Sequence, residues 1–290
     1  MENRLDTWLV ANMGIKSRSK AQELIKGGFV LINGRPASKT GEKVSEKDII
    51  TLTENDVLKY VSRGGLKLDK AIREFGLDFK DKTILDIGSS TGGFTDCALK
   101  AGARKVIAVD VGTDIMDKGL RQDSRVELHE NTDIRDFPYE EYSDTDYAVC
   151  DASFISLPVA LSKLGGPDQN FTLIALIKPQ FECGINAAKK YRGVVNNKEL
   201  HFEILRSVLL SMQRLGFYVK NITFSPICGG DGNIEYISEF IKETKFSEPV
   251  LFDPDMGENR ENLKSAVKGY GMTDTEISEL IEKAFAFFKK

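Results

Sequence analysis

From about residue 83 onward, short apolar runs alternate with helical stretches, and this alternation constrains the fold more than any other feature of the chain. Such alternation is typical of a doubly wound sheet with helices on both of its faces. We therefore expect an α/β fold built on a parallel sheet. The predicted strands cover residues 83–87, 105–110, 126–129, 147–150, 173–177, 218–224 and 235–240.

Three helices accompany these strands in the pattern. One starts at Gly92-Gly93 and runs to residue 99, and a second covers 200–215. A third follows Thr273, which is predicted to form a capping box with Glu276. Its apolar residues share one face, which favours packing against the core over membrane lysis.

The first 55 residues show a different pattern, that of a small α+β module. Apolar residues recur at helical spacing, and an Asn-Gly pair between apolar runs is typical of a type I′ hairpin turn. The predicted elements are a helix containing Leu5, Trp8 and Leu9, a helix from Ser17 or Ser19 to Gly27-Gly28, a strand over 29–32, a turn at Asn33-Gly34 and a closing strand over 44–50.

Charge is spread unevenly between these two regions. Residues 1–40 hold seven lysines and arginines against three acidic residues, whereas the whole 290-residue chain has a net charge of −4. A basic head on an acidic body predicts that the head contacts a polyanion, although a solvated basic helix face would give the same composition.

Composition narrows the class of protein. With 41% hydrophobic and 29% charged residues, the chain can bury a core and is not typical of disordered proteins. The longest apolar run, 173–177, is far short of a membrane helix, and the charged amino terminus lacks a signal-peptide pattern. We expect a cytoplasmic protein. Four widely spaced cysteines and two histidines predict no metal site.

The turn after the first strand of the large region is rich in glycine. Its spacing, Asp-x-Gly-x-x-x-Gly-Gly over 86–93, differs from both the dinucleotide fingerprint and the P-loop. Nicotinamide, nucleotide and S-adenosylmethionine (SAM) sites all use such turns, because glycines let the backbone approach a ligand. Asp110 ends the next strand and could accept hydrogen bonds from a ribose, or simply belong to the following turn.

The amino-terminal landmarks resemble the S4-like RNA-binding domain of ribosomal protein S4, pseudouridine synthases and several tRNA synthetases. They are 4–6 (RLD), 17–21 (SRSKA), 28–30 (GFV), 32–34 (ING), Val44 and 48–50 (DII). The resemblance implies RNA binding by the second helix and the loop after it. The expected phosphate contacts are Arg4, Lys16, Arg18, Lys20, Lys26 and Arg35, to which Arg63 is added from the start of the large region.

Across nearly the whole chain, a series of motifs in order resembles the TlyA (haemolysin A-like) family, and the large region also resembles FtsJ-type RNA 2′-O-methyltransferases. The motifs are 61–68 (VSRGGLKL), 85–97 (LDIGSSTGGFTDC), 108–112 (AVDVG), 151–157 (DASFISL), 178–182 (KPQFE) and 232–235 (GNIE). The resemblance implies a Rossmann-like class I SAM-dependent methyltransferase domain that methylates cytidine 2′-hydroxyls in ribosomal RNA or ribosomal subunits.

The same resemblance assigns roles to individual residues. Its catalytic set falls on Lys67, Asp151, Lys178 and Glu235. The residues expected to bind SAM are Asp86, Gly88, Ser89, Ser90, Thr91, Gly92, Gly93 and Phe94 in the turn, Asp110 and Val111 at the ribose, and Asp133 and Ile134 at the adenine.

The catalytic set also makes chemical sense from the residues. A ribose 2′-hydroxyl is a poor nucleophile, so a base or a stabilising cation must act as it attacks. Lys178 and Asp151 each end an apolar strand, at the sheet edge where ligands bind. Lys178 could accept the proton or stay charged and stabilise the alkoxide. Phe154 could stack on a base or fill the core.

We expect four segments: an S4-like domain over 1–55, a linker over 56–62, the methyltransferase domain over 63–245 and a helical extension over 246–290. Two other functions stay open at this point. One is a non-catalytic RNA-binding or ribosome-assembly factor, which the intact motifs disfavour. The other is a membrane-lytic protein, for which the sequence shows no apolar or cationic amphipathic segment.

Overall fold

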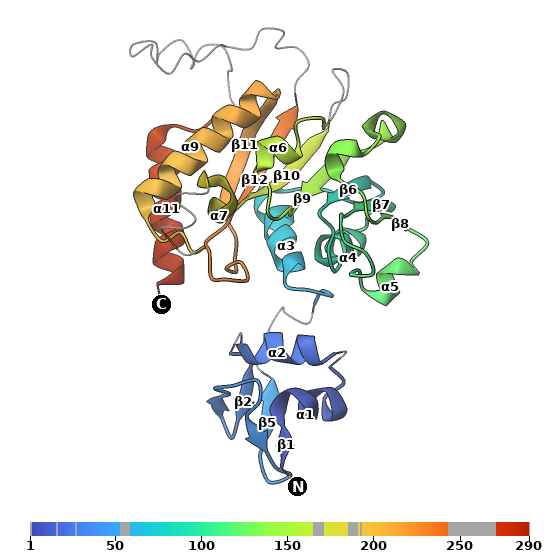
Figure 1. Ribbon diagram of the computed structural model, residues 1–290, viewed down its shortest axis with the longest axis vertical. Coiled ribbons are helices and arrows are strands. Elements are labelled where there is room, and N and C mark those ends of the chain that lie inside the picture. The colour runs from blue at the N-terminus through green and yellow to red at the C-terminus, as the bar shows by residue number, and fades with distance from the viewer. Residues whose placement is uncertain are drawn as a thin grey trace. The chain divides into compact units, whose positions relative to one another are not determined.

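The computed structural model describes residues 2–15, 17–26, 28–52, 59–164, 171–184, 191, 193–242 and 271–289. It divides into two compact units, Met1–Ser62 and Arg63–Lys290. The first unit combines short helices with small sheets, and the second is built on a large sheet with helices around it (Figure 1).

The first unit packs two helices against short antiparallel strands. Its core is formed by leucine, alanine and valine side chains without solvent exposure, among them Leu5, Leu9 and Leu24. One sheet pairs β1 with β4, and the other has the order β3-β2-β5. The elements are β1 (Asn3–Arg4), α1 (Leu5–Asn12), α2 (Arg18–Lys26), β2 (Val30–Ile32), β3 (Arg35–Pro36), β4 (Lys43–Val44) and β5 (Ile50–Leu52).

The predicted hairpin turn is confirmed, whereas the single closing strand is wrong. Asn33 and Gly34 have φ of 52° and 79°, the positive values that a type I′ turn requires, between paired strands β2 and β3. Between β4 and β5 the chain turns instead of continuing straight. The Asp48 carboxylate accepts hydrogen bonds from the Ser45 backbone N–H at 2.8 Å and hydroxyl at 2.9 Å, and this local turn separates the two strands.

The second unit is built on a seven-stranded sheet with the order β11-β12-β10-β9-β6-β7-β8. Its strands are β6 (Thr83–Ile87), β7 (Lys105–Val109), β8 (Val126–His129), β9 (Tyr147–Cys150), β10 (Thr172–Ile177), β11 (Phe217–Phe224) and β12 (Tyr236–Lys242). The described residues of this unit contain the α-helices α3 (Gly64–Phe75), α4 (Gly93–Lys100), α5 (Lys118–Arg121), α6 (Leu157–Ala160), α7 (Pro179–Glu182), α9 (Lys198–Arg214) and α11 (Asp274–Phe288).

The prediction of an all-parallel sheet is wrong at one strand. The five strands from β6 to β10 are mutually parallel, but β12 runs antiparallel to both of its neighbours, β10 and β11. The reason is the connection. Only residues 225–235 join β11 to β12, and they contain no helix, whereas a parallel pair needs a longer crossover. The sheet is therefore mixed.

Side chains alternate between the two faces of the sheet, and helices cover both. On one face Leu85, Ile107 and Ala148 join the buried residues of α6, α9 and α11 in one hydrophobic core. On the other, α4 contacts β6 and β7 and packs beside α3. This arrangement leaves the carboxyl ends of β6, β7, β9 and β10 to carry the loops of interest.

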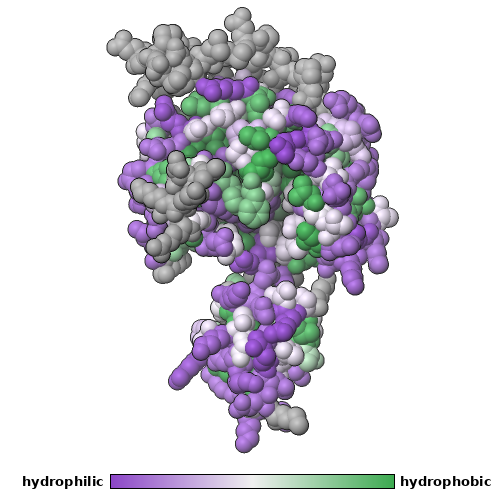
Figure 2. Space-filling view, viewed as in Figure 1, coloured by the Kyte–Doolittle hydropathy of each residue, from purple (hydrophilic) through white to green (hydrophobic). Residues whose placement is uncertain are grey.

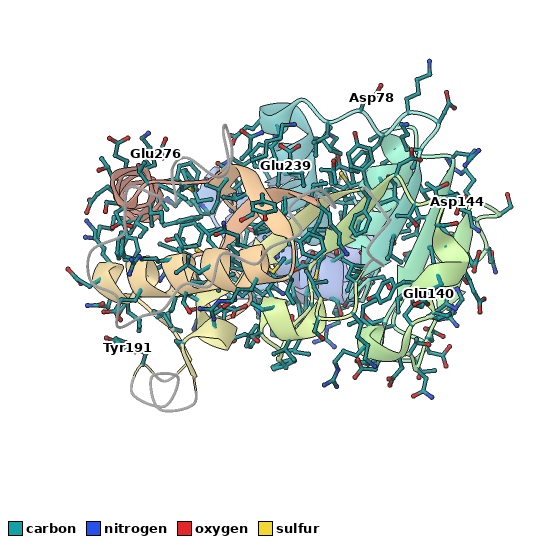
Figure 3. All side chains as sticks on the ribbon, turned by 90° about the horizontal axis from the view of Figure 1, so that it is seen from above. Asp78, Glu140, Asp144, Tyr191, Glu239 and Glu276 are labelled. Atoms are coloured by element: carbon teal, nitrogen blue, oxygen red, sulfur yellow. The ribbon has the colours of Figure 1, made fainter. Side chains whose placement is uncertain are left out.

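Helix α11 begins with the predicted capping box. Glu276 accepts from the Thr273 backbone N–H at 2.7 Å, and the Thr273 hydroxyl accepts from the Glu276 N–H at 3.2 Å. Figure 3 shows Glu276 on this helix at the border of the unit. The apolar face of α11, including Ile277 and Phe285, is buried against the core and beside α9, as predicted. Among the described residues, no helix has both the length and the apolar character that crossing a membrane would take.

Candidate active site

The glycine-rich turn between β6 and α4 is tightly enclosed. Gly88 has a φ of 76°, and a side chain there would meet the backbone of Ala152, 3.0 Å from its Cα. Gly92 has a φ of 90°, and a Cβ on it would lie 2.3 Å from a methyl carbon of Leu120. Backbone conformation favours glycine at both positions, and at Gly88 the nearby backbone of Ala152 also leaves no room for a side chain. Gly93 and Phe94 then begin α4.

Two buried polar atoms have no hydrogen-bond partner within the described part of the chain: Asp86 Oδ1 near the end of β6 and Ser89 Oγ in the turn. The other Asp86 oxygen accepts from the Thr95 hydroxyl at 2.6 Å. Burial raises the pKa of Asp86 to about 7. Buried polar groups are normally satisfied, so unpaired atoms beside a glycine turn are typical of a ligand site.

Asp110, in the loop directly after β7, ties this turn to its own loop. Its carboxylate accepts from the backbone N–H groups of Ser90 and Gly112, each at 2.7 Å. The neighbouring Val111 is exposed. The structure thus brings Asp110 next to the turn, and its predicted contact with a ribose stays a prediction.

The structure places Asp133 and Ile134 in settings that the sequence did not show. The Asp133 carboxylate holds the Arg135 guanidinium through two hydrogen bonds of 2.9 and 2.6 Å, and Arg135 lowers the pKa of Asp133 to about 2. Ile134 lies in the hydrophobic core. Adenine recognition by this pair stays a prediction, and it would have to coexist with the Arg135 contact.

Four distant segments bring Lys67, Asp151, Lys178 and Glu235 together. Lys67 comes from α3, Asp151 follows β9, Lys178 follows β10 and Glu235 precedes β12. The Lys67 ammonium lies 2.7 Å from Glu235 Oε2 and 3.4 Å from Asp151 Oδ2. The Lys178 ammonium lies 2.6 Å from Asp151 Oδ1. The result is a chain of alternating charges.

This cluster is largely removed from water. Lys67, Lys178 and Glu235 are 7%, 6% and 2% exposed. Burial opposes the charge on Lys67, but the carboxylates of Asp151 and Glu235 outweigh it and raise the Lys67 pKa above its ordinary value. Lys67 is therefore a fixed positive charge that holds two carboxylates in place.

Lys178 has three oxygen acceptors around its ammonium. Besides its ion pair with Asp151 Oδ1, it donates to the Asp151 backbone oxygen at 3.0 Å and to Ser153 Oγ at 2.8 Å. Two of these contacts are hydrogen bonds, and the contact with Asp151 Oδ1 is an ion pair. Three oxygen atoms around the Lys178 amine can fix its position, so that its positive charge can stabilise negative charge that develops nearby.

Two further side chains in the cluster were missed from the sequence. Ser153 accepts from Lys178, and the Gln180 amide donates to Glu235 Oε1 at 3.3 Å, while the Gln180 oxygen has no partner in the described structure. Both lie within two residues of a predicted catalytic residue. This closeness in sequence to Asp151 and Lys178 is the one feature of the sequence that could have indicated them.

Phe154 does not fill the core, so that alternative is excluded. Its side chain is 89% exposed, its φ is 66°, and its ring lies 5.1 Å from that of Phe181. The Phe181 ring centre lies 5.8 Å from the Lys178 ammonium. An aromatic pair with one exposed ring therefore borders the cluster.

In the first unit, two predicted RNA contacts converge on one buried carboxylate. Asp6 accepts hydrogen bonds from Arg4 at 3.0 and 3.1 Å, from Arg18 at 2.9 Å and from Gln22 at 2.9 Å. The Arg4 guanidinium holds the Asp6 pKa far below its ordinary value. The two arginine side chains stay about half exposed, at 45% and 57%. Their contact with phosphates stays a prediction.

The remaining predicted RNA contacts differ in exposure. Lys26 and Arg35 are exposed, and Figure 2 shows a largely hydrophilic surface on this unit. Lys20 is buried, and its ammonium donates to the Tyr60 backbone oxygen at 3.1 Å and pairs with Glu23 at 3.4 Å. Lys16 lies outside the described residues, and Arg63 directly precedes α3.

The FtsJ-like methyltransferase family matches residues 60–241, and the S4 domain matches residues 3–50. The 23S rRNA (cytidine-2′-O)-methyltransferase TlyA of Campylobacter jejuni is 37% identical over 259 residues, covering 82% of this chain and 99% of that protein.

Two more relatives extend the comparison. The 16S/23S rRNA (cytidine-2′-O)-methyltransferase TlyA of Mycobacterium tuberculosis is 37% identical over 235 residues, covering 80% of this chain and 87% of that protein. The solved structure of a hemolysin-like protein from Streptococcus thermophilus superposes with a TM-score of 0.69 at 34% identity, covering 99% and 97% of the two chains. With matches of this extent, the chain belongs to the TlyA family of FtsJ-like methyltransferases that carry an amino-terminal S4 domain.

Proposed function

We propose that the protein transfers the methyl group of SAM to the 2′-oxygen of cytidine in ribosomal RNA. The observation that carries this proposal is the buried alternating-charge cluster of Lys67, Asp151, Lys178 and Glu235 beside the glycine-rich turn. Two relatives that are named for this reaction cover at least four-fifths of the chain.

The glycine-rich turn fits the methionine part of SAM. Asp86 Oδ1 and Ser89 Oγ are buried polar atoms without partners among the described residues, and they lie beside the turn that leads into α4. When bound, SAM supplies an electrophilic methyl group on a sulfonium sulfur. The turn would hold the methionine part, and Asp110 the ribose.

The chemical demand on the protein is to help a poor nucleophile. As the 2′-oxygen would take the methyl group, the carbon–sulfur bond would break to leave a neutral thioether, and the hydroxyl proton would pass to solvent water. The 2′-oxygen carries developing negative charge during this step. Lys178, surrounded by three acceptors, would stabilise that charge. Lys67 would hold Asp151 and Glu235 in place, so that Lys178 is aimed at the substrate.

Substrate recognition is divided between the units in this proposal. The exposed Phe154 ring would stack on the base of the target nucleotide, since aromatic rings commonly hold unstacked RNA bases. In the first unit, Arg4, Arg18, Lys26 and Arg35 would contact phosphates and so direct the enzyme to its RNA. Because ribosomes are cytoplasmic, we place the protein there.

The predicted segments over 1–55, 56–62, 63–245 and 246–290 are kept as part of this proposal. The boundary between the two compact units falls between Ser62 and Arg63, close to residue 60, where the match to the FtsJ-like family begins. Residues 53–58, which include the first part of the predicted linker, and 246–270 of the predicted extension lie outside the described residues.

The test uses the full-length protein, SAM with a labelled methyl group, and small and large ribosomal subunits from a strain that lacks the gene. We expect label in rRNA at a ribose 2′-oxygen, mapped as a cytidine. Absence of label in both subunits, in free rRNA and in whole ribosomes would overturn the proposal. Tight RNA binding without transfer would instead support a non-catalytic assembly factor.

A further inference from the structure

Residues 151–157 connect β9 to the first residue of α6 and form a short stretch at the candidate active site, irregular up to residue 156. It carries Asp151 at its start and Phe154 at its centre. Phe154 has a positive φ of 66°, an unfavourable conformation for a bulky residue, while its ring is 89% exposed. A strained, solvent-facing aromatic residue persists only where its surroundings hold the backbone.

Both ends of this segment are held by one other stretch of chain, residues 178–182. At the start, Lys178 donates to the Asp151 backbone oxygen and to Ser153 Oγ, at 3.0 and 2.8 Å. At the end, the backbone N–H of Leu157 donates to Glu182 Oε1 at 2.7 Å. Phe181, between these two anchors, lies against Phe154.

The surroundings of Glu182 are consistent with a carboxylate whose role is to hold the Leu157 backbone. Its carboxylate forms no ion pair and no other hydrogen bond within the described part of the chain. Burial raises its pKa to about 7. A partly buried carboxylate with no cationic partner among the described residues is costly, and the hydrogen bond from Leu157 offsets part of that cost.

We propose that Glu182 is a positioning residue for the substrate nucleotide: its hydrogen bond to Leu157 fixes the 151–157 segment and so holds the Phe154 ring over Phe181 beside Lys178. This inference rests on the proposed function, because it assigns Phe154 to the base of the target cytidine. Glu182 itself touches neither the substrate nor the reacting atoms in this view.

The first experiment compares Glu182→Ala with Glu182→Gln in methylation of ribosomal subunits. The Ala variant leaves the Leu157 N–H without its acceptor, and we expect a rise in KM for the subunit of about 10-fold, the scale of one lost hydrogen bond to a charged group. Affinity for SAM should stay unchanged. The Gln variant keeps an acceptor oxygen and should restore the wild-type KM.

Glu239→Gln is the matched control. Glu239 (Figure 3) is another buried carboxylate of the same unit, on β12. It accepts hydrogen bonds from Lys220 at 2.9 Å and from Asn221 at 2.6 Å. It has no contact with the 151–157 segment among those described, so its replacement should lower stability without raising KM. A similar KM rise in Glu182→Ala and Glu239→Gln would overturn the specific role of Glu182.

A double-mutant cycle separates positioning from general stability. If Glu182 acts through Phe154, then Glu182→Ala should have almost no further effect on KM in a Phe154→Ala background. A merely structural role predicts the same fold-change in both backgrounds. Additive effects would therefore overturn the proposal.

Amide hydrogen exchange of residues 152–157 tests the anchor without any RNA. We expect faster exchange in Glu182→Ala and wild-type exchange in Glu182→Gln. Equal exchange in all three proteins would overturn the inference. If wild-type protein methylates no ribosomal RNA, the proposed function fails, whereas faster exchange in the Ala variant would still establish the anchor.

Discussion

The two units of this protein use charged side chains in opposite ways. In the first unit, one buried carboxylate, Asp6, gathers Arg4 and Arg18, whose side chains stay about half exposed. In the second, two lysines and two carboxylates alternate in a cluster in which the most exposed side chain, that of Asp151, is only 20% exposed.

The difference in burial changes how strongly the charges of each unit interact and how much desolvation a new ion pair costs. Arginine groups that are half in water can pair with a phosphate at little desolvation cost, and salt screens that interaction. Buried charges interact strongly with one another and with a reacting atom. Leaving one of them without a partner strongly destabilises the fold. The first unit is suited to targeting and the second to chemistry.

The largest effect is expected when one charge is removed from the dry cluster. Lys67→Met leaves Glu235, which is 2% exposed, without its cation. We expect the second unit to lose about 3–5 kcal/mol of stability, the usual cost of an unpaired buried charge, together with its methylation activity. Urea unfolding and the subunit assay measure both. A loss below about 1 kcal/mol would show that water reaches the cluster.

Asp86 gives a pH test of burial in the second unit. The pKa of Asp86 is about 7 in the folded protein and 3.8 for an ordinary aspartate, the value taken for the unfolded chain. Between pH 3.8 and about 7, the folded protein therefore keeps a proton on Asp86 that the unfolded chain has released. Stability should therefore fall as pH rises from about 4 to 7 and level off above, by about 4 kcal/mol in total.

Asp86→Asn should remove this pH slope, because asparagine does not titrate and can still accept from Thr95. The measurement is denaturant unfolding of both proteins at several pH values between about 5 and 8. An identical slope in the two proteins would assign the pH dependence to other groups.

Substitutions of Lys178 test whether its buried positive charge takes part in catalysis. Lys178→Ala should lower turnover by about 100-fold or more, with the dissociation constants of SAM and RNA within a few-fold of wild type. Lys178→Arg keeps a positive charge that cannot act as a base at working pH, and we expect it to be more active than Ala. Near wild-type turnover in the Ala variant would contradict the assigned catalytic set.

The first unit is tested by salt. Lys26 and Arg35 are exposed, and if each neutralises one phosphate, each Ala substitution should flatten the slope of log affinity against log salt by about 0.7–0.9. SAM affinity should not change. Unchanged slopes in the double variant would mean that this surface is only solvated.

Lys20 provides a contrast within that unit, with the smallest expected effect. Its ammonium is turned inward to the Tyr60 backbone oxygen, so Lys20→Ala should leave the salt slope unchanged and only lower stability slightly. A slope change equal to that of Lys26→Ala would show that Lys20 leaves this position to bind RNA.

Local features of the fold could be predicted from the sequence because they depend on near neighbours. Strand and helix positions follow from apolar periodicity, the turn at Asn33-Gly34 from its need for positive φ, and the α11 cap from Thr273 and Glu276. The direction of β12 could not be predicted from periodicity, since a strand has the same pattern in either direction.

The candidate site divides in the same way. The meeting of Asp151 with Lys178 could be deduced from the chain alone, because the carboxyl ends of neighbouring parallel strands lie at one edge of a sheet. Lys67 and Glu235 are far apart in the chain, and only family resemblance indicated their partnership. Which charged side chains are buried could not be predicted from the sequence, because burial depends on packing in three dimensions. Packing buried Lys20 and Lys67 but left Arg18 half exposed, since burial arises from contacts between segments that no local pattern records.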